Sequence, residues 1–228
     1  TIVIHSGSAA KISREEAMRL SCDTLEKVIE AVGDTHIRLG IETMGKINQL
    51  GTLDEVIEQC RVDRHYVPVV DFGHMNAREC GGLFKTSDDY RRVFDKIALG
   101  CGDEVAKNLH CHFSKIEYTN AGEKKHLTFA DDVYGPDFEP LIEAIVREDL
   151  TPRIICESDG TQAEDVKAMK DYYEKRSLHI KWRDGSVWVA HAGDSKVELN
   201  PEDIPLGAEH IRYEDVLRKS ASIPYSAG

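Results

Sequence analysis

Residues 67–75 read VPVVDFGHM, a short run of apolar, mostly β-branched residues that ends in Asp71 and His74. Other segments have the same form, an apolar run closed by a side chain of the kind that binds metal ions. They are residues 1–7 (TIVIHSG), 37–45 (IRLGIETMG), 108–115 (NLHCHFSK) and 153–161 (RIICESDGT). Short, nearly continuous apolar runs are typical of strands buried on both faces of a parallel sheet.

A helical pattern follows each of these runs. In the first, Ser13 is placed as the N-cap and Glu16 follows three residues later, which predicts a capping box. The predicted helical segments are residues 13–32, 52–60, 87–99, 136–146 and 161–175. Regular alternation of strand and helix predicts an α/β fold with a parallel sheet.

The strand ends carry the candidate site. In a β/α barrel the carboxyl ends of all strands lie in one ring, so residues far apart in the sequence meet in one pocket. Taken singly, each has an ordinary explanation: Glu42 suits a helix N-terminus, and Asp71 suits a turn. The recurrence at every strand end predicts one metal site instead. The candidate ligands are His5, Glu42, Asp71, His74, His110, His112 and Glu157.

Two features of this set remain open in the sequence. His110 and His112 lie two residues apart and therefore point to the same face of a strand, so either can be the ligand. A donor set of imidazoles and carboxylates without a thiolate favours a catalytic ion, with zinc, manganese and iron all suited to it.

Composition agrees with a folded soluble enzyme. Of 228 residues, 41% are hydrophobic and 31% are charged, which is ordinary for a globular domain. No apolar run approaches the roughly 20 residues that span a membrane, and no leader pattern opens the chain, so we expect a cytoplasmic protein without a membrane partner. Six cysteines without a CxxC spacing predict reduced thiols, with Cys111 and Cys156 inside strands.

The net charge of −12 bears on the substrate. Nucleic-acid-binding proteins usually present a basic face, so this charge argues mildly against a polyanionic substrate. Divalent cations gathered in a pocket can outweigh distant surface acids. The charge therefore leaves nucleic acid open as a partner.

The ordered motifs VIHSGS, GIETMG, VVDFGH, LHCHFSK and ICES resemble the endonuclease IV family of apurinic/apyrimidinic endonucleases, which belongs to the xylose isomerase-like TIM barrels. The resemblance covers about residues 1–175. It implies a (β/α)8 barrel whose carboxyl face holds two or three divalent ions, usually zinc, and hydrolysis of DNA on the 5′ side of abasic sites during DNA repair. Abasic-site DNA is then the expected partner.

The resemblance also implies ligands and roles. The first ion takes Glu42, Asp71, His110 and Glu157, and His5 binds a second ion that Glu42 bridges. Either Glu42 or Glu157 orients the attacking water.

A third ion takes His74 and His126. Lys124 occupies the family's aspartate position, and Glu123, one residue earlier, is its candidate replacement. Lys115, just after the HCHF strand, is the candidate contact to phosphate.

Strand counting sets a further expectation. The motifs begin at the family's fourth strand, which predicts a chain that lacks three βα units of the barrel. An open sheet, or a partner that supplies strands, is the alternative. The exposed edge at residues 1–4 would favour association, including a homo-oligomer.

We predict a division into residues 1–176, the metal-binding barrel portion, and residues 177–228, a C-terminal extension that packs on the barrel or on a partner. Residues 178–191 predict a β-hairpin, with Asp184 and Gly185 in the turn and Trp182 and Trp188 on its strands. Residues 210–219 predict a short final helix.

Two other functions fit the same residues. A sugar or sugar-phosphate isomerase or epimerase also uses carboxylates and a histidine around a divalent ion, and an acidic surface does not hinder a small substrate. A metal-dependent binding protein without catalysis is the third. The fold alone does not choose among them, because TIM barrels support many chemistries.

Overall fold

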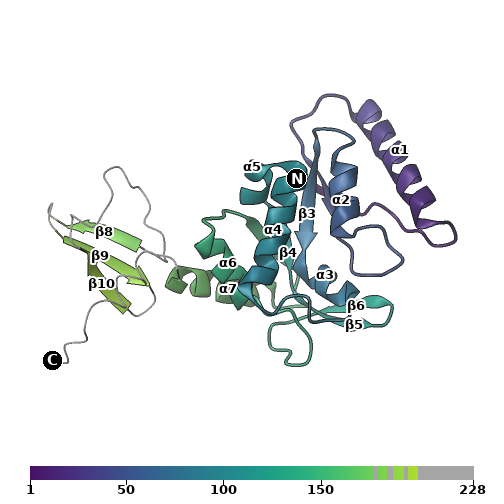
Figure 1. Ribbon diagram of the computed structural model, residues 1–228. Coiled ribbons are helices and arrows are strands. Elements are labelled where there is room, and N and C mark those ends of the chain that lie inside the picture. The colour runs from purple at the N-terminus through teal and green to yellow at the C-terminus, as the bar shows by residue number, and fades with distance from the viewer. Residues whose placement is uncertain (177–178, 184–186, 193–194, 200–228) are drawn as a thin grey trace.

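The computed structural model describes residues 1–176, 179–183, 187–192 and 195–199 of the chain (Figure 1). Within this part, one five-stranded parallel sheet has the order β1-β2-β3-β4-β7. Its strands are β1 (Ile2–Ile4), β2 (Leu39–Glu42), β3 (Tyr66–Asp71), β4 (His110–Phe113) and β7 (Arg153–Cys156). Spatial order follows chain order without a reversal, as in a β/α barrel and unlike a doubly wound sheet. The predicted α/β class is confirmed, with the sheet forming half of a barrel.

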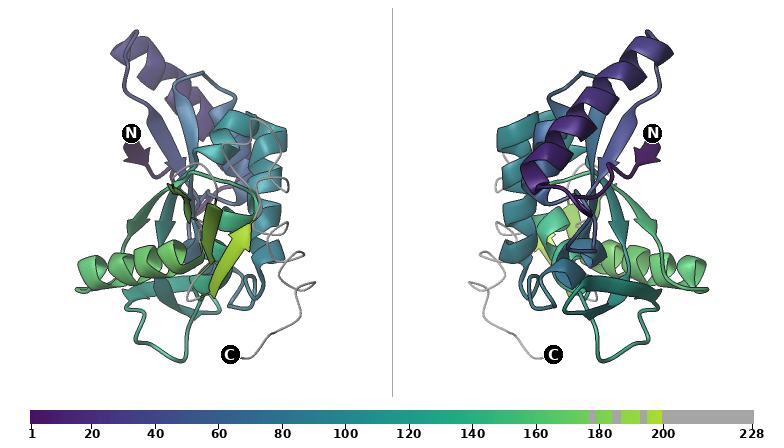
Figure 2. Two further views of the ribbon diagram at one scale, coloured as in Figure 1. Left: turned by 90° about the vertical axis from the view of Figure 1, so that its left-hand side faces the viewer. Right: turned by 90° about the vertical axis from the view of Figure 1, so that its right-hand side faces the viewer.

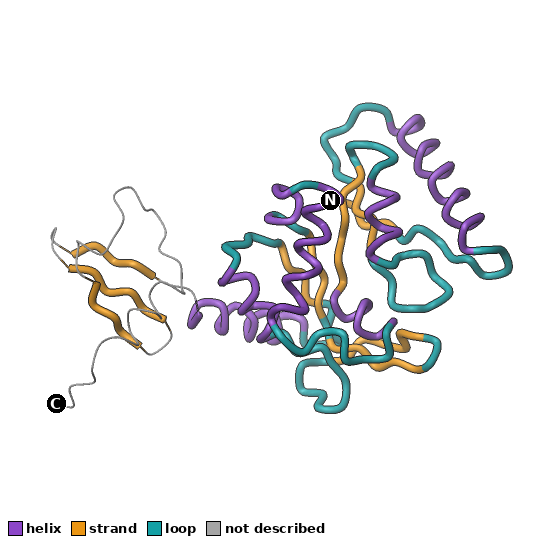
Figure 3. The backbone as a smooth tube through the Cα atoms, viewed as in Figure 1, coloured by secondary structure: helices purple, strands orange, loops and turns teal. Residues whose placement is uncertain are grey.

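Helices flank this sheet (Figure 3). They are α1 (Arg14–Val32), α2 (Leu53–Cys60), α3 (Phe72–Arg78), α4 (Ser87–Cys101), α5 (Asp103–Lys107), α6 (Glu139–Arg147) and α7 (Gln162–Arg176). The five predicted helical segments correspond to α1, α2, α4, α6 and α7. The short helices α3 and α5 were not predicted.

The first helix starts as expected, but its capping differs in one bond. The Ser13 hydroxyl accepts the backbone N–H of Glu16 at 3.1 Å. The Glu16 carboxylate does not return to the cap, because it pairs with the Arg19 guanidinium at 2.7 and 2.9 Å. The capping box predicted here was therefore wrong, and a complete one lies at Thr52 and Glu55 of α2.

Sheet register separates a core face from a site face. Val70 of β3 pairs with Cys111 of β4, and both are fully buried in the cluster that α4 and α6 cover. The next residues, Asp71 and His112, also pair in register. Because successive side chains alternate across a sheet, these two point to the opposite, inner face.

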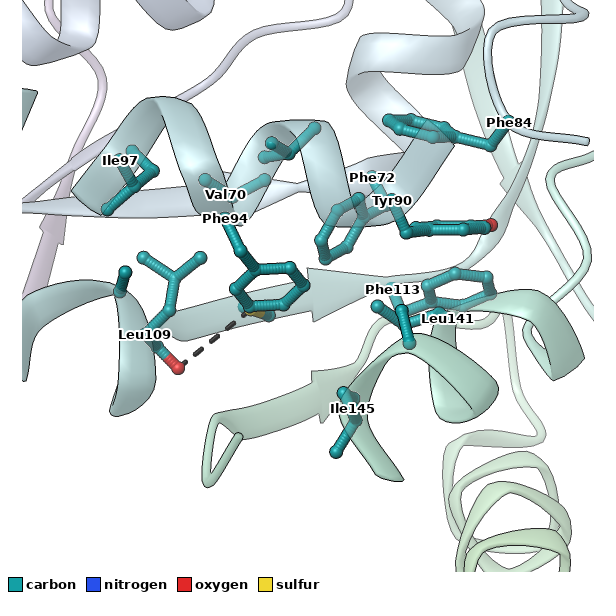
Figure 4. Packing of buried hydrophobic residues seen from close by; sticks show 14 of the residues in the cluster. Val70, Phe72, Phe84, Tyr90, Phe94, Ile97, Leu109, Phe113, Leu141 and Ile145 are labelled. Carbon is teal, nitrogen blue, oxygen red and sulfur yellow. Dashed lines mark hydrogen bonds between the residues drawn. The ribbon is translucent and has the colours of Figure 1, made fainter. Parts of the chain in front are cut away.

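The core fixes where α3 begins. Phe72, its first residue, is fully buried, with its ring 5.4 Å from Phe84 and 5.2 Å from Tyr90 in edge contacts (Figure 4). Truncating a buried phenylalanine costs about 3–5 kcal/mol. Phe72 thus anchors the helix that follows Asp71.

A β-hairpin of β5 (Lys115–Thr119) and β6 (Gly122–Leu127) extends from the end of β4. The hairpin lies beside α3 (Figure 2). The contact is close: a Cβ on Gly73 would lie 2.5 Å from the carbonyl oxygen of Ser114. Neither strand of this hairpin was predicted from the sequence.

Part of the C-terminal extension is described. Strands β8 (His179–Arg183) and β9 (Val187–Ala192) pair antiparallel with Trp182 opposite Trp188, so the predicted hairpin is confirmed. A third strand, β10 (Ser195–Leu199), pairs with β9 and was not predicted. The predicted turn residues 184–185 and the helix over 210–219 lie outside the described residues.

The cysteines behave as expected. All six are free thiols, and Cys111 and Cys156 are buried. Among the described residues, no helix combines the length and the apolar character that crossing a bilayer requires.

Candidate metal centre

Four side chains from four strand ends form the first candidate cation group. Each offers one ligand atom, and these atoms lie within 4.8 Å of one another. Its members are Glu42, Asp71, His112 and Glu157. Glu42 and Asp71 close β2 and β3, His112 lies one residue before the end of β4, and Glu157 follows β7 directly, as expected for the ring of strand ends in a barrel.

Asp71 supplies the clearest sign that a cation belongs here. Its carboxylate is fully buried, and Oδ1 accepts the backbone N–H of His74 at 2.7 Å, which caps α3. Its Oδ2 is buried without a hydrogen-bond partner. A buried carboxylate oxygen left unpaired is costly, and a divalent cation is a partner that satisfies it.

His112 lies between two carboxylates. Its Nδ1 is 2.7 Å from Oε1 of Glu42 and 3.3 Å from Oε1 of Glu157. Burial acts to lower the pKa of His112, but the hydrogen bond with Glu42 and the nearby carboxylates outweigh it and raise the pKa. A proton on this nitrogen thus occupies the position where a cation can bind.

Glu42 and Glu157 differ in environment. Burial acts to raise the pKa of Glu42, yet the hydrogen bond with His112 and the charge of His74 lower it overall. Burial raises the pKa of Glu157, and the charges of Asp71 and Glu42 raise it further. Carboxylates this close do not all ionise without a cation between them. The Glu157 side chain is 35% exposed, so it faces the solvent.

A second candidate cation group contains His74, Glu123 and His126, again with ligand atoms within 4.8 Å. The Nδ1 of His74 lies 2.9 Å from the carbonyl oxygen of Thr43, which only accepts, so Nδ1 donates there. In the neutral ring Nε2 then carries a lone pair, and it lies 3.5 Å from Oε2 of Glu123. A histidine fixed by one nitrogen and free at the other has the arrangement of a metal ligand.

His126 is held in the same way. Its Nδ1 lies 2.8 Å from the hydroxyl of Ser114, which is fully buried. Its Nε2 lies 4.0 Å from Oε1 of Glu123. The carboxylate of Glu123 therefore stands between two imidazole nitrogens, a donor set that suits zinc and other divalent transition metals.

Lys124 does not oppose a cation at this group. Its side chain is 57% exposed, and Nζ donates to the Glu117 carboxylate at 2.6 Å. The pairing runs from Tyr118 with Glu123 to Glu117 with Lys125, so Lys124 is the extra residue of a β-bulge. In a regular strand, residues three apart point to opposite faces; the bulge brings Glu123 and His126 to the same face.

His5 contacts the first group from its solvent side. Its Nε2 lies 2.8 Å from Oε2 of Glu42, and its side chain is 60% exposed. Glu42 therefore lies between His5 and His112, one at each carboxylate oxygen. His5 itself belongs to neither candidate group.

The assignment of His110 to the first group is corrected by the structure. His112 belongs to the group, because it lies two residues nearer the carboxyl end of β4 and pairs in register with Asp71. His110 instead lines a cavity of about 930 Å³ at the amino ends of the strands, together with Arg38 and Arg153.

The structure also removes Lys115 from the site. Its Nζ donates to the carbonyl oxygen of Asp131 at 2.7 Å and lies 3.1 Å from a carboxylate oxygen of Asp137. Its side chain is only 11% exposed. Lys115 therefore holds the loop after β6, with its Nζ bound to Asp131 and Asp137 and not to a member of either cation group.

Sequence reasoning missed three residues that shape the second group: Thr43, Gly45 and Ser114. Thr43 and Ser114 orient the two histidines, and Gly45 contacts Glu123. Ser114 follows the strand directly, which was the one available signal. The roles of Thr43 and Gly45 depend on contacts between segments far apart in the chain.

Comparison with known proteins finds a matching family model and a similar protein. A family model described as the xylose isomerase-like TIM barrel matches residues 1–177. An uncharacterized protein of Methanocaldococcus jannaschii is 27% identical over 175 residues, which is 76% of this chain and 63% of that protein. The chain therefore spans less than two thirds of the length of this relative.

Proposed function

The chain belongs to the xylose isomerase-like TIM barrel family, and from this premise we propose that it is a divalent-metal-dependent phosphodiesterase that cuts DNA on the 5′ side of abasic sites. One observation carries the proposal. The second candidate cation group lies directly beside the first, since Nδ1 of His74 is 3.6 Å from Oδ2 of Asp71 and 3.8 Å from Oε1 of Glu42.

Neighbouring cation groups suit phosphodiester hydrolysis. In that reaction negative charge develops on the attacking oxygen, on the leaving oxygen and on the oxygens of the phosphoryl group. Divalent cations bound at such groups supply Lewis acidity, which neutralises this charge and lowers the pKa of water toward neutrality. Zinc is the first candidate, and manganese and iron fit the same donors.

The protein's own residues divide the remaining tasks. The Glu157 side chain is 35% exposed and its pKa is raised, so its carboxylate is suited to accept a proton from the attacking water. Glu42 is almost fully buried and its ionised form is favoured, so it serves as a fixed acceptor that orients. Asp71 holds its position by capping α3, which keeps the two groups at a constant spacing.

An isomerase or epimerase acting on a sugar or sugar phosphate is the second candidate. The net charge of −12 favours a small substrate over a polyanion. Three carboxylates and one histidine in the first group also suit a bound polyol.

Incision of a duplex with one synthetic abasic site tests the proposal. The protein loaded with zinc or manganese is expected to cut 5′ to the lesion, and Glu157→Gln is expected to lose cutting while keeping its fold. Glu58→Gln, a change at an exposed glutamate of α2, is the matched control and should cut normally. Failure of the metal-loaded protein to cut, together with turnover of a sugar, would replace the proposal by the isomerase.

A further inference from the structure

We propose that the loop between β2 and α2 controls occupancy of the second cation group, with Gly45 and Arg78 as positioning residues that fix Glu123. The inference rests on the proposed function only in taking this group as a metal site. Neither Gly45 nor Arg78 is itself a candidate ligand. We refer to residues 43–52 as the β2–α2 loop.

The loop joins the tip of the β5–β6 hairpin through backbone hydrogen bonds and one isolated β-bridge. The backbone N–H of Glu123 donates to the carbonyl oxygen of Gly45 at 3.0 Å. The N–H of Ile47 donates to the carbonyl of Ala121 at 3.1 Å, and Lys46 forms an isolated antiparallel bridge with Gly122. The backbone of Glu123 is therefore held from the loop.

Gly45 leaves the space that the Glu123 side chain occupies. A Cβ at position 45 would lie 2.6 Å from Cβ of Glu123, 2.8 Å from its Oε2 and 3.1 Å from Cδ2 of His74. Gly45 is not among the residues with positive φ. An alanine there is therefore compatible with the backbone and excluded by contact alone, and the atoms it meets belong to the two ligands.

Arg78 holds the loop in place. Its Nη1 donates to the carbonyl oxygens of Met44 at 3.1 Å and Lys46 at 2.7 Å, and its Nη2 donates to that of Ile47 at 2.9 Å. Arg14 adds a bond to the Gln49 carbonyl at 2.8 Å. A planar guanidinium can serve several carbonyls at once, which a lysine ammonium cannot do with the same geometry.

Helix α3 carries both Arg78 and the candidate ligand His74. His74 and Arg78 lie four residues apart, so they share one face of the helix. Arg78 holds the β2–α2 loop, and the loop holds Glu123. The Glu123 carboxylate in turn lies beside His74, which is on the same helix as Arg78. The first group has no such dependence, because three of its four donors lie within strands of the sheet and the fourth, Glu157, follows β7 directly.

Zinc binding to the full chain tests the inference, with a chromophoric chelator as competitor and metal counting at saturation. We expect the unaltered protein to bind one ion at each group. Gly45→Ala and Arg78→Lys are expected to weaken the second ion at least tenfold while the first stays within about twofold. Arg91→Lys is the matched control, because within the described part of the chain Arg91 pairs with Asp88 and Asp95 on its own helix α4, and the variant should bind both ions normally.

A loss of zinc affinity at the second group alone indicates a positioning role, whereas a loss at both groups indicates a general destabilisation of the fold. A purely structural role for these residues would weaken both ions together and lower the melting temperature of the metal-free protein, which would overturn the inference. Normal binding of both ions by Gly45→Ala and Arg78→Lys would also overturn it, while leaving the proposed function intact. If the Glu123→Gln variant binds as many zinc ions per chain as the unaltered protein, the second group is not a metal site. In that case the proposed function loses its two-cation basis, and the inference fails with it.

Discussion

Nδ1 of His112 lies 2.7 Å from Oε1 of Glu42, although the two residues are 70 positions apart and β3 runs between their strands. They meet because both side chains point to the inner face at the carboxyl end of the sheet, where Asp71 of β3 completes the row. Against the effect of burial, their hydrogen bond raises the pKa of His112 and lowers that of Glu42, so each residue favours the charged form of the other. That pair lies at the centre of the first cation group.

Zinc is expected to stabilise the fold, and Asp71→Asn is expected to abolish most of that effect. A ligand present at about 100 times its Kd adds about 2.7 kcal/mol, which raises the Tm of a domain this size by roughly 5–10 °C. Asparagine keeps the cap on α3 but loses the charge of the unpaired Oδ2. Thermal melts with zinc and with EDTA measure the increment; an equal increment in the variant would show that the cation binds elsewhere.

Ser114→Ala should weaken the second group selectively. The variant loses the hydroxyl that fixes Nδ1 of His126 at 2.8 Å, and outer partners of this kind are worth about 10–100-fold in metal affinity. Thr24→Ala, which removes a hydroxyl bonded only within α1, serves as control. Competition titrations that resolve two ions report the change, and unaltered affinity would mean that His126 is not a ligand.

Lys124→Asp restores an aspartate where the resembling family has one, and we expect no gain in metal affinity. Lys124 is the bulged residue and points to Glu117, away from His74 and His126. Glu123→Gln should instead remove the second ion. Tighter zinc binding by Lys124→Asp would show that the hairpin changes register when metal binds.

Acid sensitivity of the fold should depend on Glu55. Burial acts to raise its pKa, but the Arg14 guanidinium and the N–H groups of Gly51 and Thr52 lower it from 4.5 to about 2. Because the folded pKa lies below the unfolded one, this stabilisation is present above about pH 4.5 and disappears as the pH falls toward 2. After allowance for solvent screening we expect about 1–2 kcal/mol.

Urea melts of the metal-free protein at pH 7 and pH 3 measure this contribution. Glu55→Gln should show a smaller loss of stability between the two pH values than the unaltered protein, whereas Glu58→Gln, at an exposed position, should show the same loss. An identical pH profile for Glu55→Gln would mean that the pair with Arg14 adds no net stability.

Much of the fold was predictable, because apolar runs and helical periods are local properties. The strands around residues 67–71 and 153–156 and the helices α4 and α7 follow from side-chain pattern alone. The helix α3 did not, because its seven residues are too few to show a period, and its signal is the single cap that Asp71 makes with His74. Asp71 and His74 are three residues apart, a spacing that we interpreted as two metal ligands. The same spacing is that of an N-cap residue and the backbone N–H it accepts.

The site was predictable by residue type but not by position. A period of two gives His110 and His112 the same face, so only register with Asp71 selects His112. The bulge at Lys124 decides that Glu123 joins His126, and a polar sequence such as GEKKHL shows no bulge. Arg78 holds the β2–α2 loop through backbone carbonyl groups, and the pattern of side chains in a sequence does not show where those groups lie.

Anomalous X-ray scattering from zinc-loaded crystals tests the central claim most directly, because it locates the ions against named residues. We expect two neighbouring peaks at the zinc edge, one among Glu42, Asp71, His112 and Glu157 and the other among His74, Glu123 and His126. The absence of a peak from both groups in crystals of protein that binds zinc in solution would contradict the claim.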